Sequence, residues 1–269
     1  MVTLSPDMPG VCRLGLATRG GSRLRAEDVE RAIASGVNYL NWCGHPDGMS
    51  QAVARLGAAR ANVVVAVQLE SRHGRDAAPE FESYLRELHT DYIDIATLYY
   101  VENRAEWDDV TAPDGAWSYL DQQKRKGRLR AIGLTSHQRP LVAACAETGL
   151  LDILMIRYNA AHRGAEDDIF PVTARRCIPV VTFTGLRWGA LLKATPEDPP
   201  GCRPAIPADC YRFCLANPNV AVALMAPADR AELDANLNLL EDWRPPAPAE
   251  MLAIRAHGER VRRHAGAFW

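Results

Sequence analysis

The sequence contains no run of about 18 apolar residues, the length that a membrane-spanning helix needs. It also does not open with the charged and then apolar pattern of a secretory signal peptide. We therefore expect a cytoplasmic protein that does not cross a membrane.

The chain has little net charge, because 31 Lys and Arg residues oppose 33 Asp and Glu residues and leave a formal charge of −2. Such a balance gives no electrostatic reason to expect nucleic acid or an anionic membrane surface as partner. A small-molecule substrate is the expected partner. The sequence makes no prediction about oligomeric state.

Cysteine pairs of the C-x-x-C type are absent, although the chain has seven cysteines. An odd number of scattered cysteines among apolar neighbours favours reduced thiols over a disulfide framework. Cys210 and Cys214 are one helical turn apart and not far from Cys202, so that they could share a metal. Their spacing matches no common zinc or iron–sulfur pattern. We expect core or loop thiols and no metal site.

Short apolar segments alternate with longer amphipathic segments from end to end, the pattern of parallel strands joined by crossover helices. Eight repeats fit into 269 residues, close to the roughly 250 of a one-domain barrel. The sequence therefore predicts a single (β/α)8 TIM-barrel domain over residues 1–269. The expected strands are 13–17, 38–42, 63–69, 92–99, 130–135, 152–158, 179–184 and 220–225.

Apolar residues at three- and four-residue spacing predict helices between these strands, at 26–35, 76–89, 114–126, 139–147, 167–176 and 228–241. Pro207, Ala208 and Asp209 open a further helix that runs into residues 210–215. Two segments fall outside the repeat. The proline-rich stretch 194–207 is too long for a bare connection, so we expect either a loop at the active-site face or an inert surface insertion. Residues 247–264 predict an extra C-terminal amphipathic helix.

Four segments of the sequence resemble the aldo-keto reductase family, and they are spread over nearly the whole chain. They are GVNY at 36–39, DYID at 91–94, GRLRAIGLTSH at 127–137, and Glu232, Leu233 and Asn236 in the helix after the last strand. Their order and spacing match the family. The resemblance implies the barrel fold and hydride transfer between a nicotinamide nucleotide and a small carbonyl compound.

The family's catalytic tetrad of aspartate, tyrosine, lysine and histidine has no match here. Asn41 stands in the aspartate position, Gln68 in the lysine position and Tyr99 in the histidine position. The loop after the second strand contains no tyrosine, and His45, Pro46 or Asp47 fills the position of the proton donor. The resemblance thus implies a divergent member whose proton donor, if it reduces carbonyls, is non-standard.

The resemblance extends to some of the positions at which the family binds its cofactor. Ser136, with His137 beside it, matches the residue that holds the carboxamide, and Phe183 matches the aromatic that stacks on the nicotinamide. Asn236 matches an adenine contact. The expected cofactor-binding residues are Ser136, His137, Phe183, Thr184, Leu186 and Asn236.

Three positions depart from the family's cofactor pattern. Met155 replaces a carboxamide-binding glutamine, and Ala226 and Glu232 stand where NADPH-dependent members present cations to the 2′-phosphate. A carboxylate there repels that phosphate, so NADH is favoured over NADPH unless Arg230 substitutes.

In a barrel the reacting groups lie at the carboxyl ends of the strands. The strand assignment puts an unusually polar set there: Asn41, Cys43, His45, Asp47, Gln68, Tyr99, His137, Arg157, Asn159, His162 and Arg163. From these we expect Asn41, His45, Asp47, Gln68 and Tyr99 as catalytic residues. Cys43, Arg157 and Asn159, together with the neighbouring Trp42 and Tyr100, are the expected substrate-binding residues.

Alternatives remain for two of these sets. The CGHPD segment at 43–47 supplies a nucleophile in Cys43, an acid or base in His45 or Asp47, or a structural turn only. Arg157 lies in an otherwise apolar strand, so its charge faces either the mouth of the barrel or a buried carboxylate such as Asp94 or Asp152.

Three functions fit the sequence. The first is a nicotinamide-dependent oxidoreductase with a rearranged proton donor such as Tyr99, His45 or His137. The second is a non-redox lyase, dehydratase or isomerase that uses the same groups to move protons. The third is a catalytically inactive ligand-binding barrel.

Overall fold

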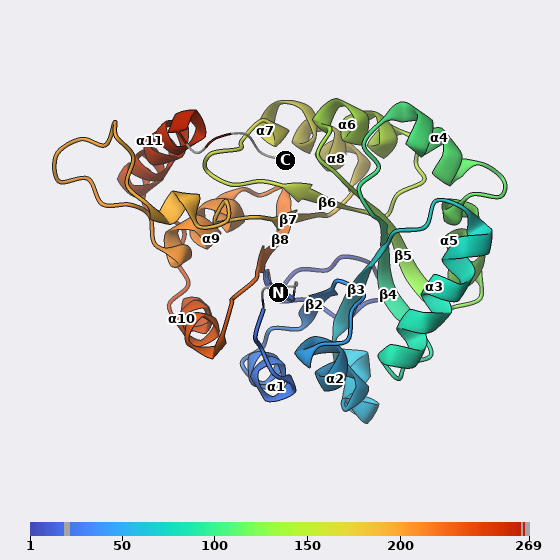
Figure 1. Ribbon diagram of the computed structural model, residues 1–269. Helices are drawn as coiled ribbons and strands as arrows, with labels where there is room; N and C mark the ends of the chain where they lie inside the picture. Colours follow the sequence, from blue (N-terminus) through green and yellow to red (C-terminus); the bar gives the residue numbers. More distant parts are fainter. Residues whose placement is uncertain (19–21, 265, 267–269) are drawn as a thin grey trace.

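Eight parallel strands close into a barrel in which each strand pairs with its neighbours in sequence and β8 pairs with β1. The computed structural model describes residues 1–18, 22–264 and 266. The predicted (β/α)8 fold is thus confirmed, and Figure 1 shows the helices arranged around the strands. The strands are β1 (Leu14–Ala17), β2 (Tyr39–Trp42), β3 (Val64–Leu69), β4 (Ile93–Leu98), β5 (Leu129–Ser136), β6 (Ile153–Arg157), β7 (Val180–Phe183) and β8 (Val220–Met225).

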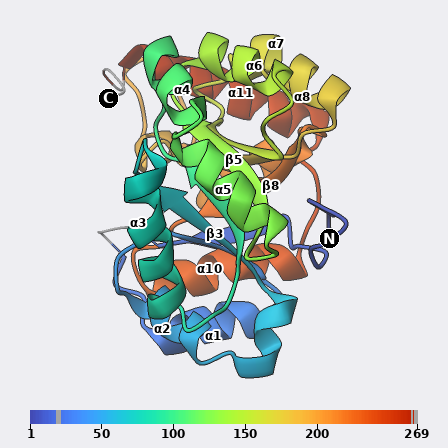
Figure 2. The same ribbon diagram turned by 90° about the vertical axis from the view of Figure 1, so that its right-hand side faces the viewer.

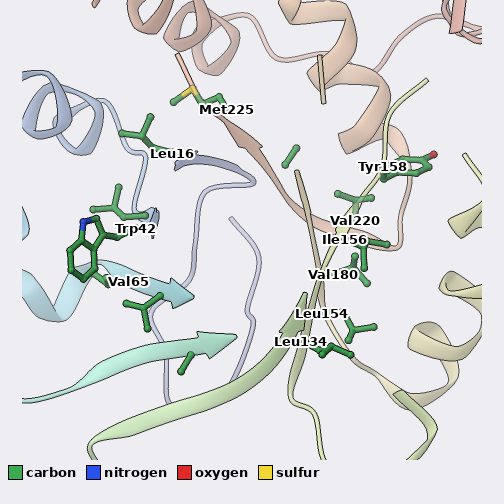
Figure 3. Packing of buried hydrophobic residues seen from close by; sticks show 14 of the residues in the cluster. Leu16, Trp42, Val65, Leu134, Leu154, Ile156, Tyr158, Val180, Val220 and Met225 are labelled. Carbon is green, nitrogen blue, oxygen red and sulfur yellow. The ribbon is translucent and has the colours of Figure 1, made fainter. Parts of the chain in front are cut away.

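The apolar side chains of the strands divide into two layers, because successive residues of a strand point to opposite faces. One layer fills the barrel and includes Tyr39, Ala66, Ile95 and Met155. The other lies between strands and helices; Figure 3 shows ten of its labelled members, among them Leu16, Trp42 and Tyr158. This division decides which strand residues can reach the mouth.

The helices agree with the predicted segments, with three differences. The structure adds α2 and α4, which lie in segments where no helix was predicted, and the helix expected at 167–176 is split into α7 and α8. The helices are α1 (Ala26–Ala34), α2 (Gly48–Ala54), α3 (Gly74–Glu87), α4 (Arg104–Thr111), α5 (Ala116–Arg125), α6 (Arg139–Glu147), α7 (Ala165–Asp168), α8 (Phe170–Arg176), α9 (Pro207–Ala216), α10 (Arg230–Glu241) and α11 (Pro248–His264), with 3-10 turns η1 (Gly57–Asn62) and η2 (Ala190–Leu192).

Capping by a single residue explains why α2 and α4 form. Asp47 accepts hydrogen bonds from the backbone N–H groups of Met49 and Ser50 at 2.9 Å each, which starts α2. Asn103 does the same for α4 through the N–H of Glu106, at 3.0 Å. Both helices are short, so their apolar residues are too few to show a helical period.

The predicted C-terminal helix is confirmed as α11, and it packs beside the loops that follow β6 and β7. Gly258 lies against the backbone of Ala160 so closely that a Cβ atom would come within 2.1 Å of its carbonyl oxygen. The buried His257 contacts the carbonyl oxygen of Leu191 at 2.9 Å. In Figures 1 and 2, α11 lies on the side of the molecule opposite α1 and α2, and Figure 1 shows it beside α9.

The proline-rich stretch 194–207 is held against α11. Asp198 accepts a hydrogen bond from Arg260 at 2.6 Å and from the N–H of Thr195 at 2.7 Å. These bonds hold the pKa of Asp198 well below its ordinary value, because they stabilise the carboxylate. The stretch thus lies over α11, the helix that borders the barrel mouth on the side of β6 and β7.

A buried ion cluster lies at the amino-terminal end of β4. Asp94 is fully buried and binds Arg60 and Arg130, each at 2.7 Å, while both guanidinium groups lie 4.4 Å from the ring of Tyr92. Asp152, just before β6, binds Lys124 at 2.6 Å. Both carboxylates lie at the amino-terminal ends of the strands, whereas Arg157 ends β6, so the alternative that pairs Arg157 with Asp94 or Asp152 is wrong.

Candidate active site at the carboxyl ends of the strands

Polar side chains replace the apolar ones of the barrel interior where the strands end. Tyr39, Ala66, Met155 and Val181 belong to the interior layer. Two residues further along each strand share that face, and these are Asn41, Gln68, Arg157 and Phe183. Three predicted mouth residues and the predicted stacking aromatic therefore come together on the inner face, from β2, β3, β6 and β7.

Four rings form a continuous row across the mouth, which we call the aromatic row: Tyr99, Tyr100, His137 and Phe183. The Tyr99 and Tyr100 rings stack at 3.9 Å, Tyr100 and His137 are 4.4 Å apart, and His137 meets Phe183 edge-on at 6.2 Å between ring centroids. Tyr100 has a φ of 47°, a left-handed conformation that turns the chain after β4. The row brings together residues that the sequence assigned separately to catalysis, substrate and cofactor.

Glu102 holds His137 in place. One of its oxygens accepts a hydrogen bond from the backbone N–H of His137 at 2.8 Å and lies 3.1 Å from Nδ1 of the same residue. A carboxylate beside Nδ1 fixes the orientation of the ring and directs Nε2 elsewhere. Glu102 was not among the predicted site residues; its position shortly after the fourth strand was the available signal.

The CGHPD loop contributes less to the mouth than predicted. His45 is exposed, and its carbonyl oxygen accepts a hydrogen bond from Nε1 of Trp42 at 2.8 Å. Asp47 caps α2, as described above. Trp42 is buried in the outer layer, where its ring meets Tyr84 edge-on at 5.3 Å. The structure therefore does not bring these three residues together at the mouth, where their predicted roles would place them.

Asn41, on the inner face of β2, lies beside Cys43. The amide nitrogen of Asn41 is 4.0 Å from the sulfur of Cys43. Asn41 is buried, and its side-chain oxygen has no hydrogen-bond partner among the residues that the structure describes. A buried acceptor of this kind is costly unless a donor reaches it, so it marks a place where a ligand can bind.

The loops after β6 and β7 are tied to each other. The buried Asn159 donates a hydrogen bond to the carbonyl oxygen of Thr184 at 2.8 Å and accepts from the N–H groups of Ala161 and His162 at 2.9 and 3.0 Å. These bonds use the Asn159 amide for structure, although we predicted that it binds substrate. Thr184 itself has a φ of 54°.

His162 and Arg187 form a second link between these loops. Nε of Arg187 donates to Nε2 of His162 at 2.9 Å, so that the imidazole carries its hydrogen on Nδ1. Burial and the arginines around it lower the pKa of His162 to about 4. The imidazole is therefore neutral at neutral pH.

The remaining cofactor candidates lie on both sides of the mouth. The hydroxyl oxygen of Ser136 accepts a hydrogen bond from the N–H of Gln138 at 3.0 Å, which leaves its hydrogen available to a ligand. Leu186 is half-buried against the outer apolar layer, and Asn236 is buried on α10. The predicted set is thus divided between β5, the loop after β7 and α10.

The start of α10 is acidic. Asp229 caps the helix by accepting from the N–H of Glu232 at 3.1 Å, and Glu232 accepts from the N–H of Ala228 at 2.8 Å. Arg230, which could compensate for these charges, lies 3.4 Å from Asp28 and 4.0 Å from Asp234.

A polar pocket of about 330 Å³ opens beside the mouth, between the ends of β5 and β6 and the helices α6, α7 and α11. Its lining is rich in charged groups from segments far apart in the sequence. It includes Ser136, His137, Arg139, Arg157, His162, Arg163, Glu166, Asp167, Glu259 and Arg262. Arg139 and Arg262 were not predicted as site residues, because nothing in the sequence indicates that α6 and α11 meet here.

The cysteines do not form a metal site or a disulfide in the described part of the chain. Cys210 and Cys214 are buried, burial raises the pKa of Cys210 to about 12, and the Cys214 thiol donates to the carbonyl oxygen of Tyr158 at 3.4 Å. Within residues 1–18, 22–264 and 266, no helix is long and apolar enough to span a membrane.

The sequence resembles a known protein family and two individual proteins. A sequence model of the Aldo/keto reductase family matches residues 14–209. The chain is 26% identical over 134 residues to an uncharacterized oxidoreductase, YrpG, of Bacillus subtilis, and 27% identical over 130 residues to an NADH-specific methylglyoxal reductase of Escherichia coli. The matches cover 48% and 46% of this chain, but only 39% and 38% of those proteins.

Solved structures agree in fold over almost the whole chain. An aldo-keto reductase, AKR11C1, from Bacillus halodurans in its holo form has a TM-score of 0.73 with 18% identity, and the match covers 92% of both chains. An aldo/keto reductase from Klebsiella pneumoniae in complex with NADP and acetate has a TM-score of 0.72 with 16% identity, covering 93% of this chain and 92% of that one.

Proposed function

Since the chain belongs to the aldo/keto reductase family, we propose that it reduces a small carbonyl compound with NADH as hydride donor and with His137, held by Glu102, as proton donor. The observation that carries this proposal is the contact of Glu102 with His137 within the aromatic row. It provides an oriented acid at the end of β5, where the barrel fold concentrates its chemistry.

The residues around the mouth fit a nicotinamide nucleotide. Asn41 offers a buried acceptor that needs a donor, Ser136 has a hydroxyl hydrogen to donate, and Phe183 presents a half-buried ring on the inner face. A bound nicotinamide would supply the hydride. Phe183 would support its ring, and Ser136 and Asn41 would hold its carboxamide.

His137 would complete the reduction by moving a proton. When the imidazole is protonated, Glu102 accepts from Nδ1–H, and Nε2–H would donate to the carbonyl oxygen as that oxygen gains negative charge. The ring of Tyr100, 4.4 Å away, restricts the imidazole and shields it from water on one side. Tyr99 lies one ring further along the aromatic row, so it is the second candidate for the donor.

The acidic start of α10 favours NADH over NADPH. A 2′-phosphate at this helix would meet the carboxylate of Glu232 and that of Asp229, which pairs with Arg23 at 3.0 Å. Arg230 lies beside Asp28 and Asp234 instead. The resemblance to an NADH-specific methylglyoxal reductase agrees with this preference.

Nucleotide titration followed by tryptophan fluorescence tests the cofactor part. We expect saturable quenching by NADH and weaker binding of NADPH; no saturable binding of either nucleotide would contradict the reductase and favour a non-redox enzyme or a binding barrel. A panel of small aldehydes and ketones with NADH then tests turnover.

Substitution tests the proton donor. We expect His137→Gln to lower kcat by about 10²–10⁴-fold while NADH binds with a Kd near that of the native protein. His89→Asn is the matched control, because His89 is exposed in a turn with a φ of 48°, which asparagine tolerates. A larger loss in Tyr99→Phe or His45→Gln than in His137→Gln would assign the donor to that residue instead.

A further inference from the structure

We propose that the pocket between β5, β6, α6 and α11 binds a carboxylate or phosphate group of the substrate, so that the protein acts on small anionic carbonyl compounds. This inference rests on the proposed function, which leaves the substrate class open. It arises from the charges that the fold gathers around the pocket.

Arginines from four different elements or loops line the pocket. Arg139 begins α6, Arg157 ends β6, Arg163 lies in the following loop, and Arg262 lies on α11. They are up to 123 residues apart in sequence, from Arg139 to Arg262. Guanidinium groups are suited to carboxylate and phosphate because their donors form a planar fork.

Arg157 follows Ile156, which pairs with Ser136 of β5 beside the proposed reaction centre. It follows the interior face of β6 and lines the same pocket as Ser136 and His137. Burial lowers its pKa to about 10, so it stays charged at neutral pH despite partial loss of water. A charge that has lost part of its hydration interacts strongly with an anion brought into the same pocket.

Three of the acidic residues around the pocket already have partners. Glu166 accepts hydrogen bonds from the Tyr158 hydroxyl at 2.6 Å and from Arg255 at 3.2 Å. Glu259 pairs with Arg163, and Asp168 binds Arg139 at 2.7 Å. Asp167 is the further carboxylate in the lining. Burial, and after it Arg187, Arg157, Arg262 and Arg139, lower the pKa of His162, so four cations act on that point of the pocket.

The guanidinium of Arg139 lies against Gly164 at the edge of the pocket. A Cβ atom at this position would come within 1.9 Å of Nη1 of Arg139. The backbone of Gly164 is in the right-handed helical region, with a φ of −59°, so the chain conformation itself does not require glycine. The absence of a side chain makes room for the arginine instead.

The α11 helix closes the pocket from the other side. Arg262 lies one residue before Arg263, which pairs with Glu197 in the 194–207 stretch and does not line the pocket. Both arginines are exposed on the same helix. They therefore offer a matched pair of substitutions that differ in whether the side chain reaches the pocket.

Binding of paired compounds without nucleotide tests the proposal by calorimetry. Pyruvate is compared with butane-2,3-dione, and dihydroxyacetone phosphate with dihydroxyacetone, so that each pair differs in the anionic group. We expect the native protein to bind at least one anionic compound about tenfold or more tightly than its neutral counterpart. The pair that shows the difference identifies the carboxylate or the phosphate as the preferred group.

Substitutions then locate the binding site. Arg157→Met and Arg262→Met should each weaken binding of the preferred anion by about fivefold or more, whereas Arg263→Met should not change it. Arg157→Lys keeps the charge and should lose less. If Arg157→Met does not fold, as judged by thermal unfolding, Arg262→Met and Gly164→Ala, which displaces Arg139, test the same pocket.

The outcomes separate this inference from the proposed function. Equal affinity for anionic and neutral compounds, or anion binding that neither Arg157→Met nor Arg262→Met weakens, would overturn the anion pocket even if NADH-dependent reduction is found. Preferential anion binding that requires both arginines would support the pocket even if neither nucleotide binds.

Discussion

Glu102 contacts His137 twice, at the backbone N–H at 2.8 Å and at Nδ1 at 3.1 Å, and so links the segment after β4 to the end of β5. The sequence separates these residues by 35 positions. Their contact gives this barrel an oriented imidazole at its mouth.

Glu102→Gln should reveal this link in the pH dependence of turnover. Glutamine can still accept from the His137 backbone N–H, but it no longer offers a counter-charge to the imidazolium. We expect kcat to fall about tenfold or more and the alkaline limb of kcat against pH to move to lower pH, with KM nearly unchanged. Asp108→Asn, in an exposed pair with Arg104 on α4, is the control; an unshifted limb would restrict Glu102 to a structural role.

Glu232→Gln should relax the choice of nucleotide. The amide oxygen can still accept from the N–H of Ala228, so α10 keeps its start while one carboxylate charge is removed. We expect the Kd for NADPH to fall about threefold to tenfold, an effect that shrinks with added salt, and the Kd for NADH to change little. Glu241→Gln, at the last residue of the same helix, should alter neither. Equal changes for both nucleotides would show that Glu232 does not face the 2′-position.

Asp94→Asn should destabilise the barrel strongly. The carboxylate is fully buried between Arg60 and Arg130, so its loss leaves two guanidinium groups without their counter-charge. We expect the free energy of unfolding in urea to fall by about 3–5 kcal/mol, against less than about 1 kcal/mol for the exposed Asp108→Asn. Similar losses in the two variants would show that the cluster contributes little.

Stability should decline as the pH falls from about 6.5 to about 4, partly through His162. Its pKa is about 4 in the folded protein, because of burial and of Arg187, Arg157, Arg262 and Arg139, but near 6.5 when unfolded. Between these values the unfolded chain binds more protons, so acid favours unfolding. His162→Gln should remove about 1–2 kcal/mol of this decline, since water reaches the half-buried ring and weakens the effect. Urea unfolding at pH 4.5 and 7 measures it; parallel pH dependences would contradict the assignment.

Much of the fold could be predicted from the sequence because it depends on local pattern. Eight apolar segments separated by amphipathic ones require parallel strands covered by helices, and this order allowed the barrel and α11 to be predicted. The short α2 and α4 were missed because their start is set by single capping residues, Asp47 and Asn103, rather than by periodicity.

The site was predicted only in part, for a related reason. Alternation along a strand indicates that Asn41, Gln68 and Arg157 reach the mouth, once the strands are known. The same rule shows that Trp42 lies on the outer face, which the assignment of Trp42 to the substrate overlooked. Asp47 and Asn159 are polar residues that follow strands, and their side chains hydrogen-bond to nearby backbone, a use that composition does not reveal.

The sequence by itself thus determined the barrel, its C-terminal helix and the end at which polar groups gather, since each follows from the period and order of apolar residues. Only the tertiary structure decided which of those groups meet. Glu102 reaches His137, and Arg139 and Arg262 face one pocket, because closing the barrel brings together loops and helices from distant parts of the chain. Contacts of this kind depend on the path of the whole chain and leave no local pattern in the sequence.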